Sequence, residues 1–503
     1  MRQYLPDHIP SKSDAMDRFD LIVIGSGAGT HVASSASDEG LKVALVDQGP
    51  TGGTCLNNGC IPSKILIYPA DVIRSLQRAR AVGVQGSIEK IEFLTIMNRM
   101  HTIVDRSRKH LETAIEADKN ITFFRSTAEF TGSYTLQVGG KTLTAPKIAI
   151  ATGARPLVPN IPGLQAAGYL DNISLLNLEA APKSLIIIGA GYIGCEYGHF
   201  FSSIGTKVTI LGRSPQVLNN EEPEICRIVK DSLGQHMQVV TGHEVVKVEL
   251  KDGKKAVSAR SRVDGMIKLF DADEILLAAG RRSNADLLKP EKTGVETDDR
   301  GWIKVNDYLE TTKEDIWALG DAIGKHMFRH TANYEAEIVA QNALRARKKD
   351  EREKADFHAV PHAVFTHPTV AGVGMKEAEA LAAGLSILVG RARYTDVAKG
   401  LAMAEEHGFV KVVLEESSGR ILGASIAGSS AAELVQQVVY LMNTEYQDLM
   451  PVMKSQVIHP TINEVLVKAF SRLEHPIRLD SHSSSADDSS ADEKENPTAS
   501  RKG

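Results

Sequence analysis

The sequence lacks several features that would assign it to a specialised class of protein. Its 503 residues include only four cysteines, too few for a disulfide-stabilised scaffold. No apolar run reaches about 18 residues, so no membrane-spanning helix is predicted. The net charge is −5 and no basic stripe is present, so nucleic-acid binding is not indicated.

The remaining composition is ordinary for a globular protein, with 42% hydrophobic and 24% charged residues. The length predicts several domains of roughly 100–200 residues each. Residues 1–16 are expected to form a flexible leader with Met16 as an alternative start, and no secretory signal is predicted. The Ser-, Asp- and Glu-rich residues 475–503 are expected to be a disordered tail.

Two of the cysteines, Cys55 and Cys60, lie close together in the segment 52–64, Gly-Gly-Thr-Cys-Leu-Asn-Asn-Gly-Cys-Ile-Pro-Ser-Lys. This spacing can close as a small disulfide ring at the start of a helix, where the helix N-terminus lowers the pKa of a nearby thiol. The glycines of the segment let the backbone approach a flat ligand. A lone close pair in so long a chain suits a reducing compartment, so we predict a cytoplasmic protein with a catalytic disulfide.

Half of a zinc site and two buried thiols are the alternative interpretations of this pair. Zinc needs two further Cys or His ligands at short spacing. Cys195 and Cys226 are far along the chain and unpaired, so no metal ligands are predicted.

A dinucleotide-binding unit precedes the cysteines. An apolar strand over 21–24 leads into Gly25-Ser26-Gly27-Ala28-Gly29-Thr30, then a helix to about residue 39 and a strand ending at Asp47. Such glycines permit a tight turn and close approach to a pyrophosphate, and the acid binds ribose hydroxyls. Thr30 stands where the third glycine of the fingerprint is expected, which predicts slightly wider helix–strand packing.

A second dinucleotide unit opens at Ser184 and contains all three fingerprint glycines, Gly189, Gly191 and Gly194. Its second strand is followed by Gly212-Arg213-Ser214, without the acid that favours NAD. Arg213 and Ser214 can bind a 2′-phosphate, which predicts use of NADP(H).

Together, the cysteine segment and the two units resemble the class I pyridine nucleotide–disulfide oxidoreductases over about residues 18–472. The resemblance is greatest to the dihydrolipoamide dehydrogenase and mycothione reductase groups, with mercuric-reductase-like features such as Arg213-Ser214. It implies an α/β protein with two Rossmann-like domains, one binding FAD and one binding NAD(P)(H), and a C-terminal α+β dimerisation domain. It also implies a homodimer.

The resemblance implies domain limits. Residues 17–158 form the first part of the FAD-binding domain, 159–284 the NAD(P)-binding domain, 285–350 the return to the FAD-binding domain, and 358–473 the dimer-interface domain.

The resemblance also implies cofactor contacts beyond the two glycine-rich turns. Lys64 is expected to pair with Glu196 beside the flavin. The other implied contacts are Gly53, Thr54, Thr152, Gly153, Gly280, Asp321, His330 and Ala332.

The catalytic roles follow from the same resemblance. Cys60 would be the charge-transfer thiolate next to the flavin, and Cys55 the interchange thiol that meets substrate. His459 would be the acid/base because thiol–disulfide exchange moves a proton at each sulfur. Glu464 would fix its tautomer, and the pair would act across the dimer.

We therefore predict an FAD-dependent NAD(P)H–disulfide oxidoreductase, with dihydrolipoyl dehydrogenase as the leading function. Its partners would be a small-molecule or lipoyl disulfide and a possible 2-oxo acid dehydrogenase complex. The alternatives are an NADPH-dependent reductase of a low-molecular-weight disulfide, of mycothione or glutathione type, and a redox-sensing flavoprotein without turnover. No cysteine follows Cys226, which argues against mercury reduction.

Overall fold

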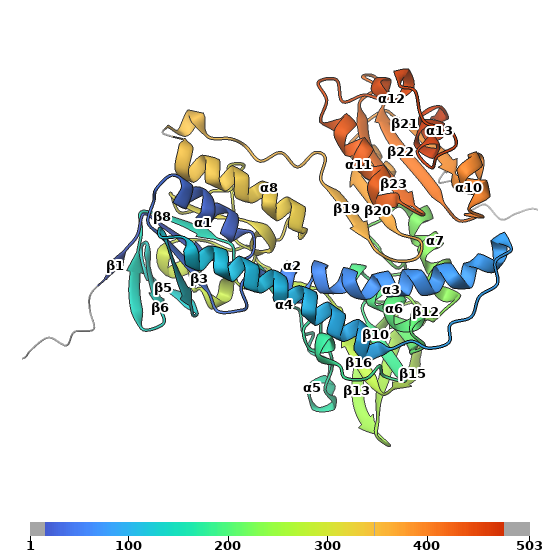
Figure 1. Ribbon diagram of the computed structural model, residues 1–503, viewed down its shortest axis with the longest axis horizontal. Coiled ribbons are helices and arrows are strands. Elements are labelled where there is room, and N and C mark those ends of the chain that lie inside the picture. The colour runs from blue at the N-terminus through green and yellow to red at the C-terminus, as the bar shows by residue number, and fades with distance from the viewer. Residues whose placement is uncertain (1–15, 347, 477–503) are drawn as a thin grey trace, which may run out of the picture.

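The computed structural model describes residues 16–346 and 348–476. The predicted leader and tail therefore lie outside the described residues, apart from Met16 at one end and His475 and Pro476 at the other. The described chain forms two α/β units and a C-terminal domain, arranged along an elongated molecule (Figure 1).

The first dinucleotide unit is built on a five-stranded parallel sheet of order β18-β8-β2-β3-β4. Its strands are β2 (Leu21–Ile24), β3 (Val43–Asp47), β4 (Ile121–Arg125), β8 (Lys147–Ile150) and β18 (Ile316–Ala318). All four residues of β2 are apolar and buried, as expected for a strand covered on both faces. Helices α1 (Gly29–Asp38) and α8 (Arg329–Ala340) pack side by side on this sheet (Figure 1).

A smaller sheet of order β1-β7-β6-β5 lies beside the parallel sheet. Its strands are β1 (Asp17–Arg18), β5 (Ala128–Gly132), β6 (Thr135–Val138) and β7 (Lys141–Thr144). Phe130, Leu136 and Leu143 are fully buried and belong to the same hydrophobic core as β2. This sheet therefore completes the first unit rather than forming a separate one.

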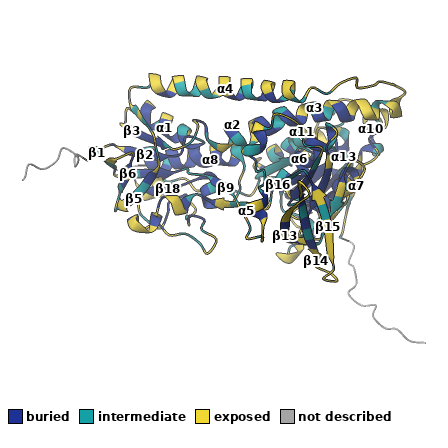
Figure 2. Cartoon of the chain, turned by 90° about the horizontal axis from the view of Figure 1, so that it is seen from below, coloured by how far each residue is buried: buried dark blue, intermediate teal, exposed yellow. Residues whose placement is uncertain are grey.

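Three helices span the molecule, and the first two carry the cysteine segment. They are α2 (Gly53–Asn58), α3 (Cys60–Arg78) and α4 (Phe93–Ala117), with a 3₁₀ turn at Ala79–Val82 after α3. Helix α4 packs against α3 and leaves its outer face exposed (Figure 2).

The second dinucleotide unit has a parallel sheet of order β12-β11-β10-β16. Its strands are β10 (Ser184–Ile188), β11 (Lys207–Leu211), β12 (Gln238–Val240) and β16 (Glu274–Leu277), with helices α6 (Tyr192–Ser203) and α7 (Pro223–Gly234). An antiparallel sheet of β13 (His243–Lys251), β14 (Lys254–Ser261) and β15 (Ile267–Ala272) extends it, with α5 (Leu164–Ala167) against β13. Paired strands β9 (Ala154–Pro156) and β17 (Arg281–Ser283) join the two units.

The C-terminal domain is a six-stranded antiparallel sheet of order β19-β20-β23-β22-β21-β24. Its strands are β19 (Pro361–Val364), β20 (Val370–Gly374), β21 (Ile387–Arg393), β22 (Phe409–Glu415), β23 (Ile421–Ala427) and β24 (Leu473–Glu474). The helices are α9 (Glu377–Ala382), α10 (Ala398–Ala402), α11 (Ala431–Met442), α12 (Met450–Lys454) and α13 (Glu464–Phe470).

A buried ionic cluster ties this domain to the second dinucleotide unit. Lys411 on β22 is 3% exposed and lies 2.9 Å from Glu222 and 3.1 Å from Glu224, both at the start of α7. It also contacts Glu377 of its own domain at 2.5 Å. Because a buried charge is costly unless it is paired, this cluster fixes the relative position of the two domains.

Candidate active site

The first glycine-rich turn is shaped by backbone contacts that leave no room for a side chain. Gly25 has φ +112°, and a Cβ there would lie 2.1 Å from the carbonyl oxygen of Ala151. A Cβ on Gly53 would lie 2.8 Å from Cα of Gly27, so the cysteine segment packs directly on the turn. The glycines therefore bring the two segments together, because only residues without a Cβ fit at this contact.

A cleft of about 860 Å³ opens over this contact. It is lined by both cysteines and by eleven of the predicted cofactor-binding residues: Gly25, Gly27, Asp47, Gly53, Thr54, Lys64, Thr152, Gly153, Glu196, Asp321 and Ala332. The predicted contact residue Gly280 does not line the cleft, but the next residue, Arg281, does.

Two predicted details of the cleft differ in the structure. His330 does not line it: its Nε2 donates a hydrogen bond to the Pro361 carbonyl at 2.7 Å, and its ring stacks on Phe328. The close helix–strand contact expected of a third glycine is made by Gly29, where a Cβ would lie 2.9 Å from Cγ1 of Val23. Thr30 instead turns its hydroxyl to the Gly27 carbonyl at 2.8 Å.

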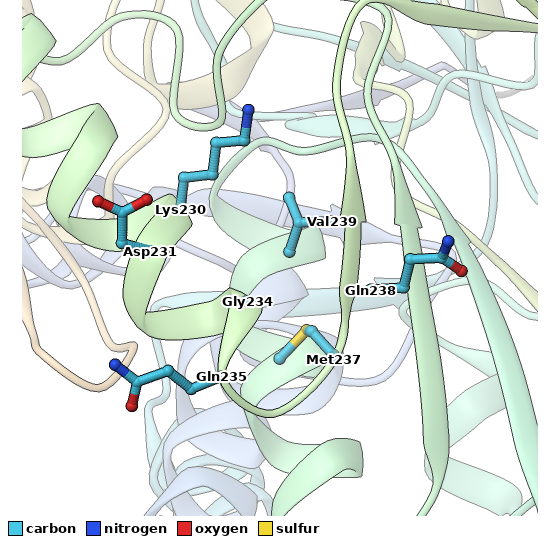
Figure 3. Close-up of a pocket in the computed structure, with 7 residues that line it drawn as sticks. All are labelled: Lys230, Asp231, Gly234, Gln235, Met237, Gln238 and Val239. Atoms are coloured by element: carbon cyan, nitrogen blue, oxygen red, sulfur yellow. The ribbon is translucent and has the colours of Figure 1, made fainter.

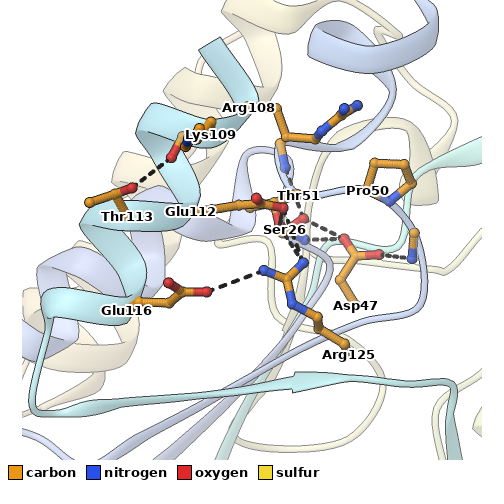
Figure 4. A network of polar contacts seen from close by, with 12 residues as sticks. Ser26, Asp47, Pro50, Thr51, Arg108, Lys109, Glu112, Thr113, Glu116 and Arg125 are labelled. Atoms are coloured by element: carbon orange, nitrogen blue, oxygen red, sulfur yellow. Dashed lines mark hydrogen bonds and ion pairs between the residues drawn. The ribbon is translucent and has the colours of Figure 1, made fainter. Parts of the chain in front are cut away.

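Asp47 is bound to the glycine-rich turn. Its Oδ2 accepts hydrogen bonds from the backbone N–H and the hydroxyl of Ser26, both at 2.6 Å, and its Oδ1 accepts from Gly49 at 2.8 Å. The neighbouring Thr51 belongs to a second group with Glu112 and Arg125 (Figure 4). Asp47 thus holds the turn in place while lining the cleft, and its contact with a ribose stays a prediction.

The cysteine pair lies where two helices meet. Gly59 separates α2 from α3, and a Cβ on Gly59 would lie 2.9 Å from the carbonyl of Thr54 and 3.4 Å from Cα of Cys55. Cys60 is therefore the first residue of α3, directly beside the chain that carries Cys55. Both are free thiols, with Cys55 half-buried and Cys60 exposed.

The two thiols have divergent proton affinities. The pKa of Cys60 is lowered to about 7, because the Cys55 thiol donates a hydrogen bond to the Cys60 sulfur and the charge of Lys64 acts in the same direction, together outweighing the opposing effect of burial. The same hydrogen bond, together with burial, raises the pKa of Cys55. Near neutral pH the pair therefore holds a thiolate at Cys60 and a proton at Cys55.

Lys64 and Glu196 form the ion pair that the sequence predicted. Nζ of Lys64 lies 2.8 Å from both carboxylate oxygens of Glu196, and it stands 4.6 Å from the ring centre of Phe365. Glu196 also accepts a hydrogen bond from the Phe365 backbone at 3.0 Å. This pair joins α3, α6 and the C-terminal domain at one side of the cleft.

The cleft fits a flavin dinucleotide. The hydroxyl of Thr152 is buried at its wall and has no partner among the described residues. Burial raises the pKa of Asp321, which is held by Arg281 at 3.4 Å. An unsatisfied hydroxyl, a glycine cradle and a carboxylate at the cleft wall are the groups that a ribityl and pyrophosphate chain requires.

The second glycine-rich turn repeats the backbone of the first. Gly189 has φ +121°, with its added Cβ 2.1 Å from the Ala278 carbonyl, and a Cβ on Gly194 would lie 2.0 Å from the carbonyl of Gly189. Nothing lies within 4 Å of a Cβ built on Gly191, which leaves space beside the turn. Arg213 is exposed and makes no hydrogen bond or ion pair with any residue that the structure describes; Ser214 is partly exposed.

His459 and Glu464 form a pair outside this cleft. Nδ1 of His459 donates to Glu464 at 2.9 Å, while the backbone of Thr461 donates to the other carboxylate oxygen at 3.0 Å. The hydrogen bond from His459 lowers the pKa of Glu464. The His459 side chain is 70% exposed, and neither residue lines the cleft of its own chain.

A second hollow in the surface is unsuited to this chemistry. It measures about 530 Å³ and is lined by seven residues at the end of α7 and the start of β12 (Figure 3). Neither glycine-rich turn nor a cysteine contributes to it. Within 16–346 and 348–476, no group of three His, Cys, Asp or Glu residues could hold a metal ion.

None of the helices described is both long and apolar enough to cross a membrane.

Two dinucleotide units with a dithiol at their junction define a flavin- and nicotinamide-dependent disulfide oxidoreductase. Residues 19–336 match the model of the family described as pyridine nucleotide-disulphide oxidoreductase, and residues 360–470 match that family's dimerisation domain. The chain belongs to this family, whose members bind FAD and NAD(P)H. The dimerisation domain indicates a homodimer.

Several relatives cover most of the chain. Mercuric reductase of Staphylococcus aureus is 34% identical over 83% of this chain and 76% of its own length. Mycothione reductase of Mycobacterium tuberculosis is 33% identical over 90% of this chain and 99% of its own length. Dihydrolipoyl dehydrogenase of Chlamydia muridarum is 32% identical over 89% of this chain and 95% of its own length.

Among solved structures, the HOCl-induced flavoprotein disulfide reductase RclA from Escherichia coli is similar to this chain. The TM-score is 0.79 at 29% identity, with 90% of this chain and 99% of that chain covered.

Two residues at the cleft wall escaped the sequence analysis. Tyr192 follows the second glycine-rich turn, and its hydroxyl donates to Glu221 at 2.6 Å. Arg329 is the first residue of α8. Tyr192 stands inside a recognised fingerprint and could have been noted there, whereas no motif marks Arg329.

Proposed function

We propose that the chain transfers electrons between NAD(P)H and a dithiol–disulfide substrate through Cys55 and Cys60, within a homodimer. The observation that carries this proposal is the pair of thiols with opposite pKa shifts in the cofactor cleft. Dihydrolipoamide, free or carried by a 2-oxo acid dehydrogenase complex, is the first candidate substrate. The cysteine segment and the His459 stretch support it by their resemblance to dihydrolipoyl dehydrogenase.

In the reductive direction, the chemistry at sulfur runs in two exchanges. Cys55 loses its proton and attacks one substrate sulfur, so that a mixed disulfide forms and the substrate S–S bond breaks. The departing sulfur takes up a proton. The Cys60 thiolate then attacks the Cys55 sulfur, which re-forms the protein disulfide and releases the second substrate thiol.

A bound flavin supplies the two-electron link between nicotinamide and sulfur. Each turnover moves two electrons from NAD(P)H to the substrate: NAD(P)H gives up a hydride, solvent supplies one proton, and the disulfide becomes two thiols.

The raised pKa of Cys55 requires a base for the first exchange. We assign this role to His459 of the partner subunit. The assignment rests on the exposure of His459 in one chain, its hydrogen bond to Glu464 through Nδ1, and its absence from the cleft of its own chain. This arrangement leaves Nε2 free to exchange a proton.

The second candidate is an NADPH-dependent reductase of a low-molecular-weight disulfide, of mycothione or glutathione type. The exposed, unpaired Arg213 and the missing acid after β11 favour it, because a 2′-phosphate needs a cationic partner and is repelled by a carboxylate. Under either candidate, a dithiol that must stay reducible suits the cytoplasm.

A substrate panel tests this proposal. The purified homodimer is assayed with NADH and with NADPH against lipoamide, glutathione disulfide and mycothione-type disulfides. Turnover of lipoamide above the others supports the first candidate, and preference for one of the small disulfides with NADPH supports the second. If no disulfide is reduced while the flavin is still reduced by nicotinamide, the proposal is wrong and a sensor without turnover is favoured.

A further inference from the structure

The basic side chains that line the cofactor cleft are not equivalent. There are four of them, and three have carboxylate partners. Lys64 binds Glu196 at 2.8 Å, Arg155 binds Asp286 at 2.6 Å, and Arg281 lies 3.4 Å from Asp321. Within the chain that the structure describes, the fourth, Arg329, forms no hydrogen bond and no ion pair.

The position of Arg329 is set by helix α8. It is the first helical residue, preceded by Phe328 in an extended conformation. Its Nη1 lies 3.9 Å from the position that a Cβ would take on Gly27, and Cα of Gly53 lies 3.8 Å from that same point. The guanidinium therefore stands at the contact between the glycine-rich turn and the cysteine segment.

The electrostatics of this place favour an anion from outside the chain. Ala28 of the turn that starts α1, and Arg329 and Ala332 of the first turn of α8, all line the cleft, so two helix N-termini face it. The two acids of the first unit that line the cleft already have partners: Asp47 is bound by Ser26 and Gly49, and Asp321 lies 3.4 Å from Arg281. A partly buried guanidinium without an internal partner is complemented by a ligand with paired anionic oxygens.

We infer that Arg329 binds the pyrophosphate of FAD, as a charged side-chain ligand in addition to the backbone of the glycine-rich turn. The inference rests on FAD binding, which the family establishes, and is independent of which disulfide the enzyme reduces. It makes retention of the flavin dependent on a residue that no fingerprint contains.

A competing role for Arg329 is to act on Cys55. Hydrogen bonding to Cys60 and burial raise the pKa of Cys55, and the charge of Arg329 acts in the opposite direction. The two roles are separable, because a pyrophosphate ligand controls flavin release, whereas a thiol partner controls the pH at which Cys55 reacts.

The experiment measures release of FAD from the holoenzyme by the rise in flavin fluorescence after dilution. The variants are Arg329→Gln and Arg329→Lys, with Arg345→Gln as the matched control that removes one charge just after α8, outside the cleft. We expect release to be about 10- to 100-fold faster in Arg329→Gln, the range that one charged hydrogen-bond partner spans. Arg329→Lys should be intermediate, and Arg345→Gln should match wild type.

Two further measurements keep the outcome decisive. Release from wild type should accelerate with ionic strength more steeply than release from Arg329→Gln, because the screened contact is absent from the variant. The pH profile of Cys55 alkylation is recorded in a Cys60→Ser background with and without Arg329→Gln. Unchanged FAD release overturns the inference, and a Cys55 profile moved to higher pH would then assign Arg329 to the thiol. If Arg329→Gln fails to fold, the release rate of Arg329→Lys decides alone.

Discussion

We call Cys55, Cys60 and Lys64 the cleft half of the proposed site, and His459 with Glu464 the histidine half. The two halves differ in how many of their hydrogen-bond and ion-pair partners lie within one chain. In the cleft half, Cys55, Cys60 and Lys64 already have their partners: thiol with thiol, and ammonium with Glu196. In the histidine half, His459 is bound only on its Nδ1 side and is 70% exposed. The two thiols and the lysine therefore find their partners within one chain, whereas Nε2 of His459 has no partner among the described residues.

This difference separates two requirements of thiol–disulfide exchange. Making a stable thiolate needs fixed neighbours, which secondary structure within one chain provides. Moving a proton to a substrate sulfur needs a group that approaches from the open side. In the proposed mechanism, His459 of the partner subunit makes that approach and leaves the cleft open to substrate.

The largest effect is expected from Cys60→Ser, which breaks the cleft half. We expect disulfide reduction to fall by at least about 10⁴-fold, as for loss of a catalytic nucleophile. FAD should stay bound because the glycine-rich turn and Asp321 are untouched, and artificial acceptors that take electrons from the flavin should still be reduced. Steady-state assays with a disulfide and with such an acceptor check this, and full activity with lipoamide would contradict the mechanism.

His459→Ala breaks the histidine half and should cost about 10²- to 10⁴-fold, as for a lost general acid/base. The flavin spectrum and the alkylation of Cys60 should be unchanged. Mixing inactive Cys55→Ser and His459→Ala chains should restore about a quarter of the sites by random pairing. If activity does not return although subunit exchange is verified, both groups act within one chain.

Arg213→Glu extends the comparison to the second dinucleotide unit, where the side chain of Arg213 also has no partner among the described residues. The wild type should prefer NADPH modestly, because Arg213 offers one exposed charged partner to a 2′-phosphate. The substitution should lower the ratio of kcat/KM for NADPH over NADH by roughly 10- to 100-fold. A wild-type ratio well below one that the substitution leaves unchanged would remove Arg213 from the cofactor site.

The smallest effect concerns proton affinity rather than rate. The thiolate of Cys60 should form as pH rises through about 7. Lys64→Met should move this midpoint upward by roughly one unit, because it removes a nearby positive charge. Glu196→Gln should move it in the opposite direction, since Glu196 raises the pKa of Cys60. The pH dependence of Cys60 alkylation gives the midpoint for the wild type and for both variants. Equal midpoints in all three proteins would show that the ion pair does not act on the thiol.

The sequence predicted those parts of the site in which the type of residue determines the backbone conformation and how closely another segment can pack. Gly25 and Gly189 stand where a Cβ would lie 2.1 Å from a carbonyl oxygen, so a glycine at these places reports a contact directly. The Lys64–Glu196 pair was also predicted, because both residues lie at fixed offsets from motifs on α3 and α6.

Side-chain direction was the part that could not be predicted. His330 and Arg329 are neighbours at the start of α8, yet one turns to Pro361 and the other to the cleft. Which way each points depends on how α8 packs against segments distant in the sequence. The same reason applies to Gly29 and Thr30. The fingerprint places the helix–strand contact at position 30, but in the folded chain Gly29 makes that contact and Thr30 binds the Gly27 carbonyl.

Helix α3 connects Cys60 to the dimerisation domain. It has 19 residues, so it is about 28 Å long at 1.5 Å per residue. Cys60 is its first residue, and Arg78, its last, holds His367 at 3.0 Å and the Ala404 carbonyl at 3.2 Å in the dimerisation domain. One helix therefore joins Cys60 to the dimerisation domain, and we expect a shift of that domain against Arg78 to change the position of the Cys60 sulfur.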